Sequence, residues 1–217
     1  MWGLTPLQIA AWAALIVFVL LGLRHQSPSE LLGDRRSQHL VFGSAACVFF
    51  LWLFRTGIYD GLNVHFLWLT ALTLALGYRR AIISGILALL GVTLIGYESW
   101  PMLGINATLG VIIPISLSYI IYNVVFHKLP RNVFIYIFLC AFVPGALMIA
   151  LKMTLLGGYY LLEGIHSWPV IQDNYLILIP LLLFPEAMLN GMTMTLMIIY
   201  KPSWAYTFYD KFYLFHK

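Results

Sequence analysis

The sequence predicts an all-α, polytopic membrane protein built as a single domain over residues 1–217. Its composition is 62% hydrophobic and only 9% charged, which leaves too few charges to cover the surface of a soluble domain of this length. The mean hydropathy is +0.90, and the apolar residues fall into long runs separated by short polar segments. Because a transmembrane helix needs about 20 consecutive apolar residues, these runs predict helices that cross a lipid bilayer.

Seven apolar runs are expected to form the membrane helices, at residues 5–23, 39–54, 64–77, 81–97, 103–126, 132–156 and 174–200. In the first run, Thr5 is a suitable N-cap and Pro6 a suitable first helical residue. The third run is short for a full crossing and must tilt little or be shielded by its neighbours. Pro144 and Pro185 predict kinks in the sixth and seventh helices, where neighbouring groups satisfy the freed carbonyls.

The loop charges predict the orientation of the chain. The first, third and fifth loops and the tail carry nearly all of the basic residues, whereas the second loop holds only Arg55 and the other two hold none. The positive-inside rule therefore places the N-terminus outside and the C-terminus in the cytoplasm, in the inner membrane of the cell. The aromatic and basic tail at residues 202–217 is expected to lie in the membrane interface.

This topology gathers the acidic side chains at the outer face. The residues expected there are Asp60, His65, Glu98, Glu163, His166 and Asp173. His65 opens the third run after Asp60 and Asn63, and imidazole is a common ligand for nickel, cobalt, copper and zinc. Carboxylates such as Glu98 or Asp173 could fix its tautomer. The alternative is a histidine that is hydrogen-bonded at a helix end.

Polar residues inside the apolar runs are further candidates. Glu186 lies near the middle of the last run, where a charge costs roughly 2.5–3.5 kcal/mol, and Asn190 follows one turn later. The Glu186 side chain either has a role in function or is a structural carboxyl beside Pro185. Lys152 is the one basic residue inside an apolar run, and it either pairs with Glu186 or extends its ammonium to the outer surface. Asn106 fits a tight helix crossing near His65 or a hydrogen bond between helices.

Several function classes are excluded. The sequence has no Walker, nucleophile-elbow or HExxH motif, and no paired catalytic groups at one depth, so we expect no enzyme. The basic residues are spread over short loops rather than one face, which argues against nucleic-acid binding. The histidines do not face each other at one depth as a bis-histidine haem site requires.

Two segments resemble the CbiM/NikM type of energy-coupling-factor transporter subunit, which captures cobalt or nickel. They are Val64-His-Phe-Leu-Trp-Leu-Thr-Ala-Leu-Thr-Leu-Ala-Leu-Gly77 and Leu103-Gly-Ile-Asn-Ala-Thr-Leu-Gly110. Pro185-Glu-Ala-Met-Leu-Asn-Gly191 is similar to the final helix of the family. In that family the metal is held by the N-terminal amine, by a histidine at position 2 with its backbone nitrogen, and by a second histidine that His65 matches. This chain has Trp2 at the second position, so only His65 carries over.

The resemblance implies a permease subunit of an ABC-type transporter. It would bind a divalent transition metal at His65, with Asn106 as support and Glu98, His166 or Asp173 completing the site. A transmembrane coupling subunit and cytoplasmic ATPases would be its partners. The alternative is a non-transporting accessory subunit of a larger membrane complex, which keeps the fold but has lost the metal site.

Overall fold

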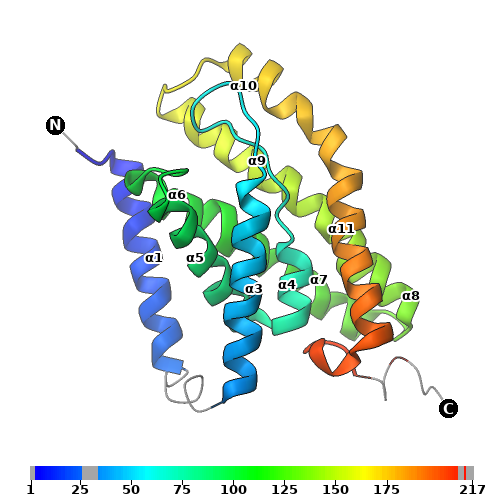
Figure 1. The fold of residues 1–217 in the computed structure, drawn as a ribbon. Helices are drawn as coiled ribbons and strands as arrows, with labels where there is room; N and C mark the ends of the chain where they lie inside the picture. Colours follow the sequence, from blue (N-terminus) through cyan, green and yellow to red (C-terminus); the bar gives the residue numbers. More distant parts are fainter. Residues whose placement is uncertain (1–2, 26–33, 210–212, 214–217) are drawn as a thin grey trace.

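The computed structural model describes residues 3–25, 34–209 and 213 and confirms the all-α membrane fold (Figure 1). Within these ranges the regular structure is helical, apart from an isolated antiparallel bridge between Thr56 and Val64. In chain order the elements are α1 (Pro6–His25), α3 (Arg35–Leu53), α4 (Leu69–Leu76), α5 (Tyr78–Leu94), η1 (Trp100–Met102), α6 (Leu103–Ala107), η2 (Thr108–Ile112), α7 (Ile113–Lys128), α8 (Val133–Ile135), η3 (Tyr136–Phe142), α9 (Val143–Leu162), α10 (Trp168–Asn174), η4 (Leu176–Leu178), α11 (Ile179–Tyr200) and η5 (Pro202–Trp204).

Three continuous apolar helices are long enough to cross a membrane within the described part of the chain. They cover Trp100–Lys128, Val133–Leu162 and Trp168–Tyr200, and each joins several of the elements above. They extend the fifth predicted helix at both ends, the sixth at its C-terminal end and the seventh at its N-terminal end. The orientation of the chain in the bilayer stays a prediction.

Two of these helices contain a π turn just before a proline. The turn Thr108–Ile112 ends two residues before Pro114, and Tyr136–Phe142 ends two residues before Pro144. A proline ring clashes with the carbonyl four residues earlier and cannot donate to it. The wider π turn moves that carbonyl away, so both helices pass the proline without breaking.

The prediction of a third helix over residues 64–77 is wrong in its first third. Residues 54–68 form an irregular segment, and α4 begins only at Leu69 after Trp68, which adopts a left-handed backbone conformation with φ of 56°. An apolar run cannot by itself distinguish a buried extended segment from a helix. Gly77 ends the helix as expected, with φ of 77°.

The short helix α4 is the centre of the bundle. All eight of its residues are buried, and α5, α7, α9 and α11 pack around it (Figure 1). Its last carbonyls are bonded by the segment after η5, because Tyr206 N donates to Ala75 O at 2.9 Å and Thr207 N to Leu74 O at 3.2 Å. The tail therefore packs partly inward against the end of α4, while Tyr206 and Tyr209 keep exposed rings.

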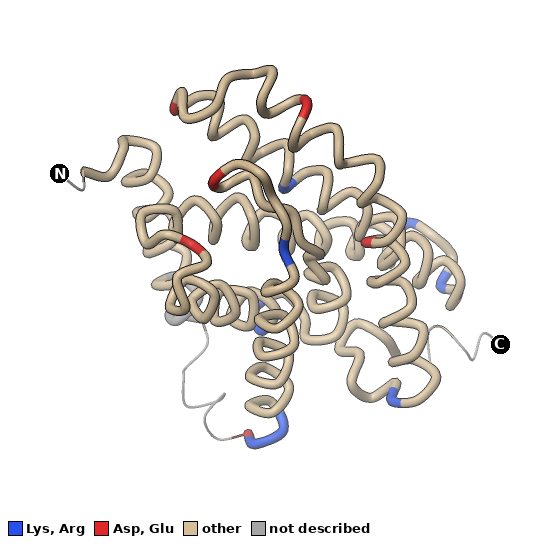
Figure 2. Tube along the Cα trace, turned by 45° about the horizontal axis from the view of Figure 1, so that its top comes forward, with Lys and Arg blue, Asp and Glu red and all other residues tan. Residues whose placement is uncertain are grey.

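The start of the chain and the acidic loops lie at the same end of the bundle. Thr5 caps α1 as predicted, since Gln8 N donates to Thr5 Oγ1 at 3.3 Å and Thr5 N donates back to Gln8 Oε1 at 3.1 Å. Thr5 Oγ1 also donates to Glu163 Oε1 at 2.9 Å, which ties α1 to the end of α9. Figure 2 shows that most of the Asp and Glu positions lie toward this end, away from the start of α3.

The opposite end is marked by the cap of α3. Asp34 accepts hydrogen bonds from Arg36 N at 3.1 Å and Ser37 N at 3.2 Å, and the Ser37 hydroxyl also donates to it. The hydroxyl bond and the two amide bonds lower the pKa of this carboxyl from its ordinary value. A charged cap at this position favours the helix start through the helix dipole.

A close crossing joins α1 to α6. A Cβ atom added at Gly104 would lie 2.8 Å from Trp12 N and 3.1 Å from the carbonyl carbon of Ala11. Two backbones meet here, so no flexible side chain can move aside. The predicted tight crossing near Asn106 is thus a backbone contact that only glycine permits.

We expect Gly104→Ala to destabilise the protein by about 1–3 kcal/mol, because the added methyl group separates α1 from α6. Gly158→Ala is the matched control, since a Cβ at Gly158 meets nothing within 4 Å and alanine favours a helix. Thermal unfolding in detergent checks both variants. Equal melting temperatures for the wild type and Gly104→Ala would show that the crossing is loose.

Candidate functional site

His65 lies on the irregular segment 54–68, which enters the bundle between α3 and α4. The bridge between Thr56 and Val64 holds the residues between them as a narrow hairpin. Thr56 N donates to Val64 O at 3.1 Å, and Val64 N donates to Thr56 O at 2.8 Å. The side chain of His65 is 9% exposed. The segment therefore delivers an imidazole into the interior rather than to a helix end at the surface.

The hydrogen bonds of His65 fix its tautomer. Nδ1 lies 3.0 Å from the carbonyl oxygen of Phe66, and a carbonyl oxygen can only accept, so Nδ1 carries the proton. Nε2 then has the free lone pair, and it lies 2.6 Å from Lys152 Nζ. The ring of Trp52 lies beside the imidazole with a centroid separation of 5.3 Å. The nitrogen that would bind a ligand is thus oriented toward Lys152.

Lys152 extends from α9 into the same space and is 7% exposed. Its stem passes the π turn at Gly110, where an added Cβ would lie 3.7 Å from Lys152 Cε. Within the described residues it forms no ion pair. Both sequence-based expectations for Lys152 are therefore wrong, because it neither pairs with Glu186 nor reaches the surface.

A second chain of polar contacts borders this pair. The Arg55 guanidinium forms an ion pair with Glu98, and its Nε donates to Trp52 O at 2.9 Å. Glu98 Oε2 accepts from Asn106 Nδ2 at 2.8 Å. One carboxylate oxygen of Glu98 therefore contacts Arg55 and the other accepts from Asn106. The side-chain oxygen of Asn106 takes no part in its bond to Glu98.

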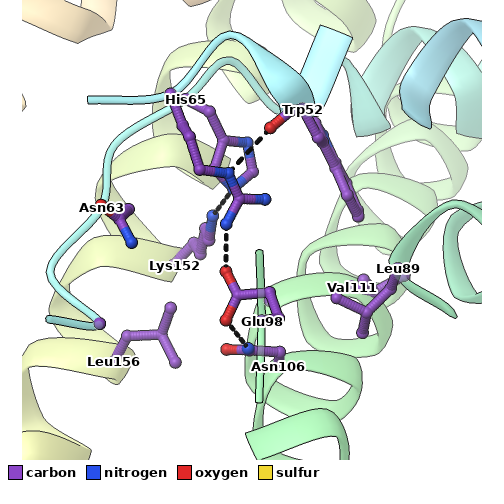
Figure 3. Close-up of a pocket in the computed structure, with 12 residues that line it drawn as sticks. Trp52, Asn63, His65, Leu89, Glu98, Asn106, Val111, Lys152 and Leu156 are labelled. Atoms are coloured by element: carbon purple, nitrogen blue, oxygen red, sulfur yellow. Dashed lines mark hydrogen bonds and ion pairs between the residues drawn. The ribbon is translucent and has the colours of Figure 1, made fainter. Parts of the chain in front are cut away.

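These groups surround a small internal cavity of about 20 Å³ (Figure 3). The residues that line it are Trp52, Arg55, Gly61, Asn63, His65, Leu89, Glu98, Asn106, Gly110, Val111, Lys152 and Leu156. A cavity of this size holds about one water molecule or a single ion. The structure thus brings together four of the residues singled out from the sequence, His65, Glu98, Asn106 and Lys152.

The two remaining residues of the predicted site, His166 and Asp173, lie elsewhere. His166 donates from Nε2 to the carbonyl of Asp60 at 2.9 Å and packs its ring between Tyr59 and Tyr160. Asp173 is exposed on α10. Neither residue lines the cavity, so their place in the predicted site is taken by Lys152 and Arg55.

Arg55 was not singled out from the sequence, although a signal for it was present. It is the one basic residue in the second loop, which the positive-inside rule assigns to the outer side. A basic residue on the outer side is an exception to this rule, and we expect it to have an acidic partner. Glu98 is that partner, and the pairing became visible only in the structure.

Glu186 and Asn190 hold the start of α4. The two Glu186 carboxylate oxygens accept from Leu67 N and Trp68 N, each at 2.8 Å. Asn190 Oδ1 accepts from Ala71 N at 2.8 Å, and its Nδ2 donates back to Glu186 Oε1 at 2.8 Å. The first amide groups of a helix have no partner within it, and inside a membrane no water can replace them. Glu186 is therefore the cap of a buried helix, and the first amide that it binds lies two residues after His65.

The chemistry open to the cavity follows from its donors. It offers an imidazole nitrogen, a lysine amine, and the amide side chains of Asn63 and Asn106. No group of three or more His, Cys, Asp or Glu side chains that could hold a metal ion occurs within the described ranges. Nitrogen donors favour borderline metals such as nickel, cobalt and copper over calcium or magnesium.

Comparison with known proteins decides the family. The model of CbiM, described as the cobalt uptake substrate-specific transmembrane region, matches residues 4–204. The chain belongs to the CbiM family. Membership of this family shows that the protein is a transporter component and not an enzyme, and that it is a membrane component of metal uptake, as the sequence predicted.

The fold agrees with this CbiM assignment. The crystal structure of a truncated transition metal transporter superposes with a TM-score of 0.74, covering 90% of this chain and 95% of that chain at 18% sequence identity. At this identity the likeness supports the fold alone. No curated protein matches the sequence.

We expect Glu186→Ala to destabilise this CbiM protein by about 1–3 kcal/mol for each buried amide left without an acceptor. Amide hydrogen exchange at residues 67 and 68 should accelerate, because the cap of α4 is lost. Met188→Ala is the control, since Met188 lies on the same helix and is 37% exposed. Unchanged exchange in Glu186→Ala would show that α4 does not depend on this carboxylate.

Proposed function

We propose that this protein is the substrate-capture permease subunit of an energy-coupling-factor-like ABC transporter, and that it binds a divalent transition metal, cobalt or nickel, in the cavity around His65. The observation that carries the proposal is the orientation of His65. Its protonated Nδ1 is held by Phe66 O at 3.0 Å, which turns the lone pair of Nε2 toward the cavity, where Lys152 Nζ is its hydrogen-bond partner at 2.6 Å. A fixed tautomer of this kind is typical of metal-binding histidines.

The surroundings of the cavity support a role in capture without chemistry. Arg55, Glu98 and Asn106 form a closed hydrogen-bonded chain, which leaves no carboxylate free to act as a general base. The acidic positions that gather at one end of the bundle would attract cations from the outer side of the inner membrane, and Glu98, one of these acidic residues, lines the cavity. Glu98 would then contribute electrostatically, while Asn106 supports the site through its amide.

Energy for transport would come from partners. The sequence has no nucleotide-binding motif, and the described helices leave large apolar side chains exposed along α11, including Leu181, Phe184 and Ile199. In this proposal the bilayer and a transmembrane coupling subunit cover such faces, and cytoplasmic ATPases drive the cycle. Recovery of neither partner from native membranes with the tagged protein would count strongly against it.

A specific contact favours the second candidate function, an accessory subunit without a metal site. Lys152 Nζ lies 2.6 Å from His65 Nε2, the atom that would bind the metal. If that amine permanently excludes the substrate, the fold would serve assembly alone. Metal analysis separates the two functions, because the accessory subunit binds no metal at His65.

We expect the detergent-purified protein, prepared without a histidine tag, to bind nickel or cobalt in a His65-dependent manner. His65→Ala should lower the bound metal by about tenfold or more, because it removes the oriented nitrogen donor. His166→Ala is the matched control, since this histidine lies at the same end but outside the cavity. Metal content by mass spectrometry after exposure to each ion is the measurement. Equal metal in all three proteins, or none in the wild type, would contradict the proposal.

A further inference from the structure

We propose that the side-chain amine of Lys152 is a second nitrogen ligand of the transported metal, beside Nε2 of His65. This inference rests on the proposed function, since it concerns the same cavity and the same substrate. It assigns a role to the one basic residue within an apolar run. It also gives the proposed site a second nitrogen donor, whereas the resemblance to the family carries over one, His65.

The two nitrogen atoms lie close enough together to bind one ion after a small movement. Lys152 Nζ and His65 Nε2 are separated by 2.6 Å, the distance of a hydrogen bond. Two nitrogens each about 2.0–2.1 Å from one ion are about 2.9 Å apart at a right angle and about 3.4 Å apart at the tetrahedral angle. The pair must therefore separate by less than about 1 Å as an ion enters.

The competing partners of both nitrogens are absent or already engaged. His65 Nδ1 is bonded to Phe66 O, so only Nε2 is available to a ligand. The nearby carboxylate of Glu98 is bonded to Arg55 and Asn106, and that of Glu186 is bonded to the start of α4. Within the described part of the chain Lys152 therefore has a neutral acceptor and no ion pair, which leaves its amine free to change partner.

The cavity provides room and further donors. Its volume of about 20 Å³ lies directly beside the two nitrogens, and Asn63 and Asn106 line the same space (Figure 3). An ion held by the two nitrogens would retain water or take an amide oxygen in its remaining positions. Gly110 faces Lys152 without a side chain, so the lysine stem has space to adjust.

The exchange is balanced in atoms and charge. The amine coordinates through its lone pair, so a protonated Lys152 releases one proton to water as the metal–nitrogen bond forms. The entering ion loses two water molecules to the two nitrogens. The charge of the cavity then rises by one rather than two, which reduces the cost of placing a divalent ion in a buried site.

The test compares metal binding by the full-length wild type with that of Lys152→Met and Lys152→Arg, using copper, nickel and cobalt salts. Methionine keeps the length of the side chain without an amine, and arginine keeps the positive charge without a lone pair. Lys201→Met is the control, because Lys201 is exposed at the end of α11. We expect both Lys152 variants to bind each ion about tenfold more weakly or worse, and the control to match the wild type.

Electron paramagnetic resonance of the copper-loaded wild type gives an independent reading that does not depend on the folding of a variant. Incorporation of ¹⁵N-lysine should change the nitrogen hyperfine pattern if the amine is a ligand. An unchanged pattern would overturn the inference, as would metal binding that needs His65 but is equal or stronger in Lys152→Met. That last result would make Lys152 a tethered cation that competes with the substrate, and the proposed function would still hold. Absence of His65-dependent binding in the wild type would instead overturn the proposed function together with the inference.

Discussion

The capping of a short helix inside the bundle is the constraint on which the rest of the structure depends. Helix α4 is buried on every side, so its terminal amide and carbonyl groups cannot be bonded by water. Glu186 and Asn190 of α11 supply acceptors at its start, and residues 206 and 207 supply donors at its end. Elements more than a hundred residues apart thus meet at one helix of eight residues, and the bundle closes around it.

The position of His65 follows from this arrangement. The same carboxylate that caps α4 binds the amides of Leu67 and Trp68, two and three residues after the histidine. The bridge between Thr56 and Val64 fixes the segment on its other side. His65 is therefore held from both directions by backbone contacts. Small shifts of α11 would be transmitted to the imidazole, which gives the proposed capture site a direct link to a membrane-spanning helix.

The buried polar residues around this site divide into three groups with different partners. Glu186 and Asn190 satisfy backbone groups and so build the fold. Arg55, Glu98 and Asn106 satisfy one another at the border of the cavity. His65 and Lys152 form a hydrogen bond with each other and none with a carboxylate among the described residues. This separation explains why so apolar a chain keeps these few ionisable groups, and why their contacts had to be seen before a role could be assigned.

The sequence by itself determined the membrane class, most of the helices and the cap at Thr5, because apolar run length and residue type are local properties. It placed Asn106 near His65 but left Glu98, His166 and Asp173 as alternatives beside it. It also marked Glu186 and Lys152, since an ionisable residue in a long apolar run is costly wherever it lies. Only the tertiary structure decided that residues 54–68 are not helical, that Glu186 caps α4, and that Lys152 meets His65. These outcomes depend on which distant group satisfies a buried hydrogen bond, and spacing along the chain does not encode that choice.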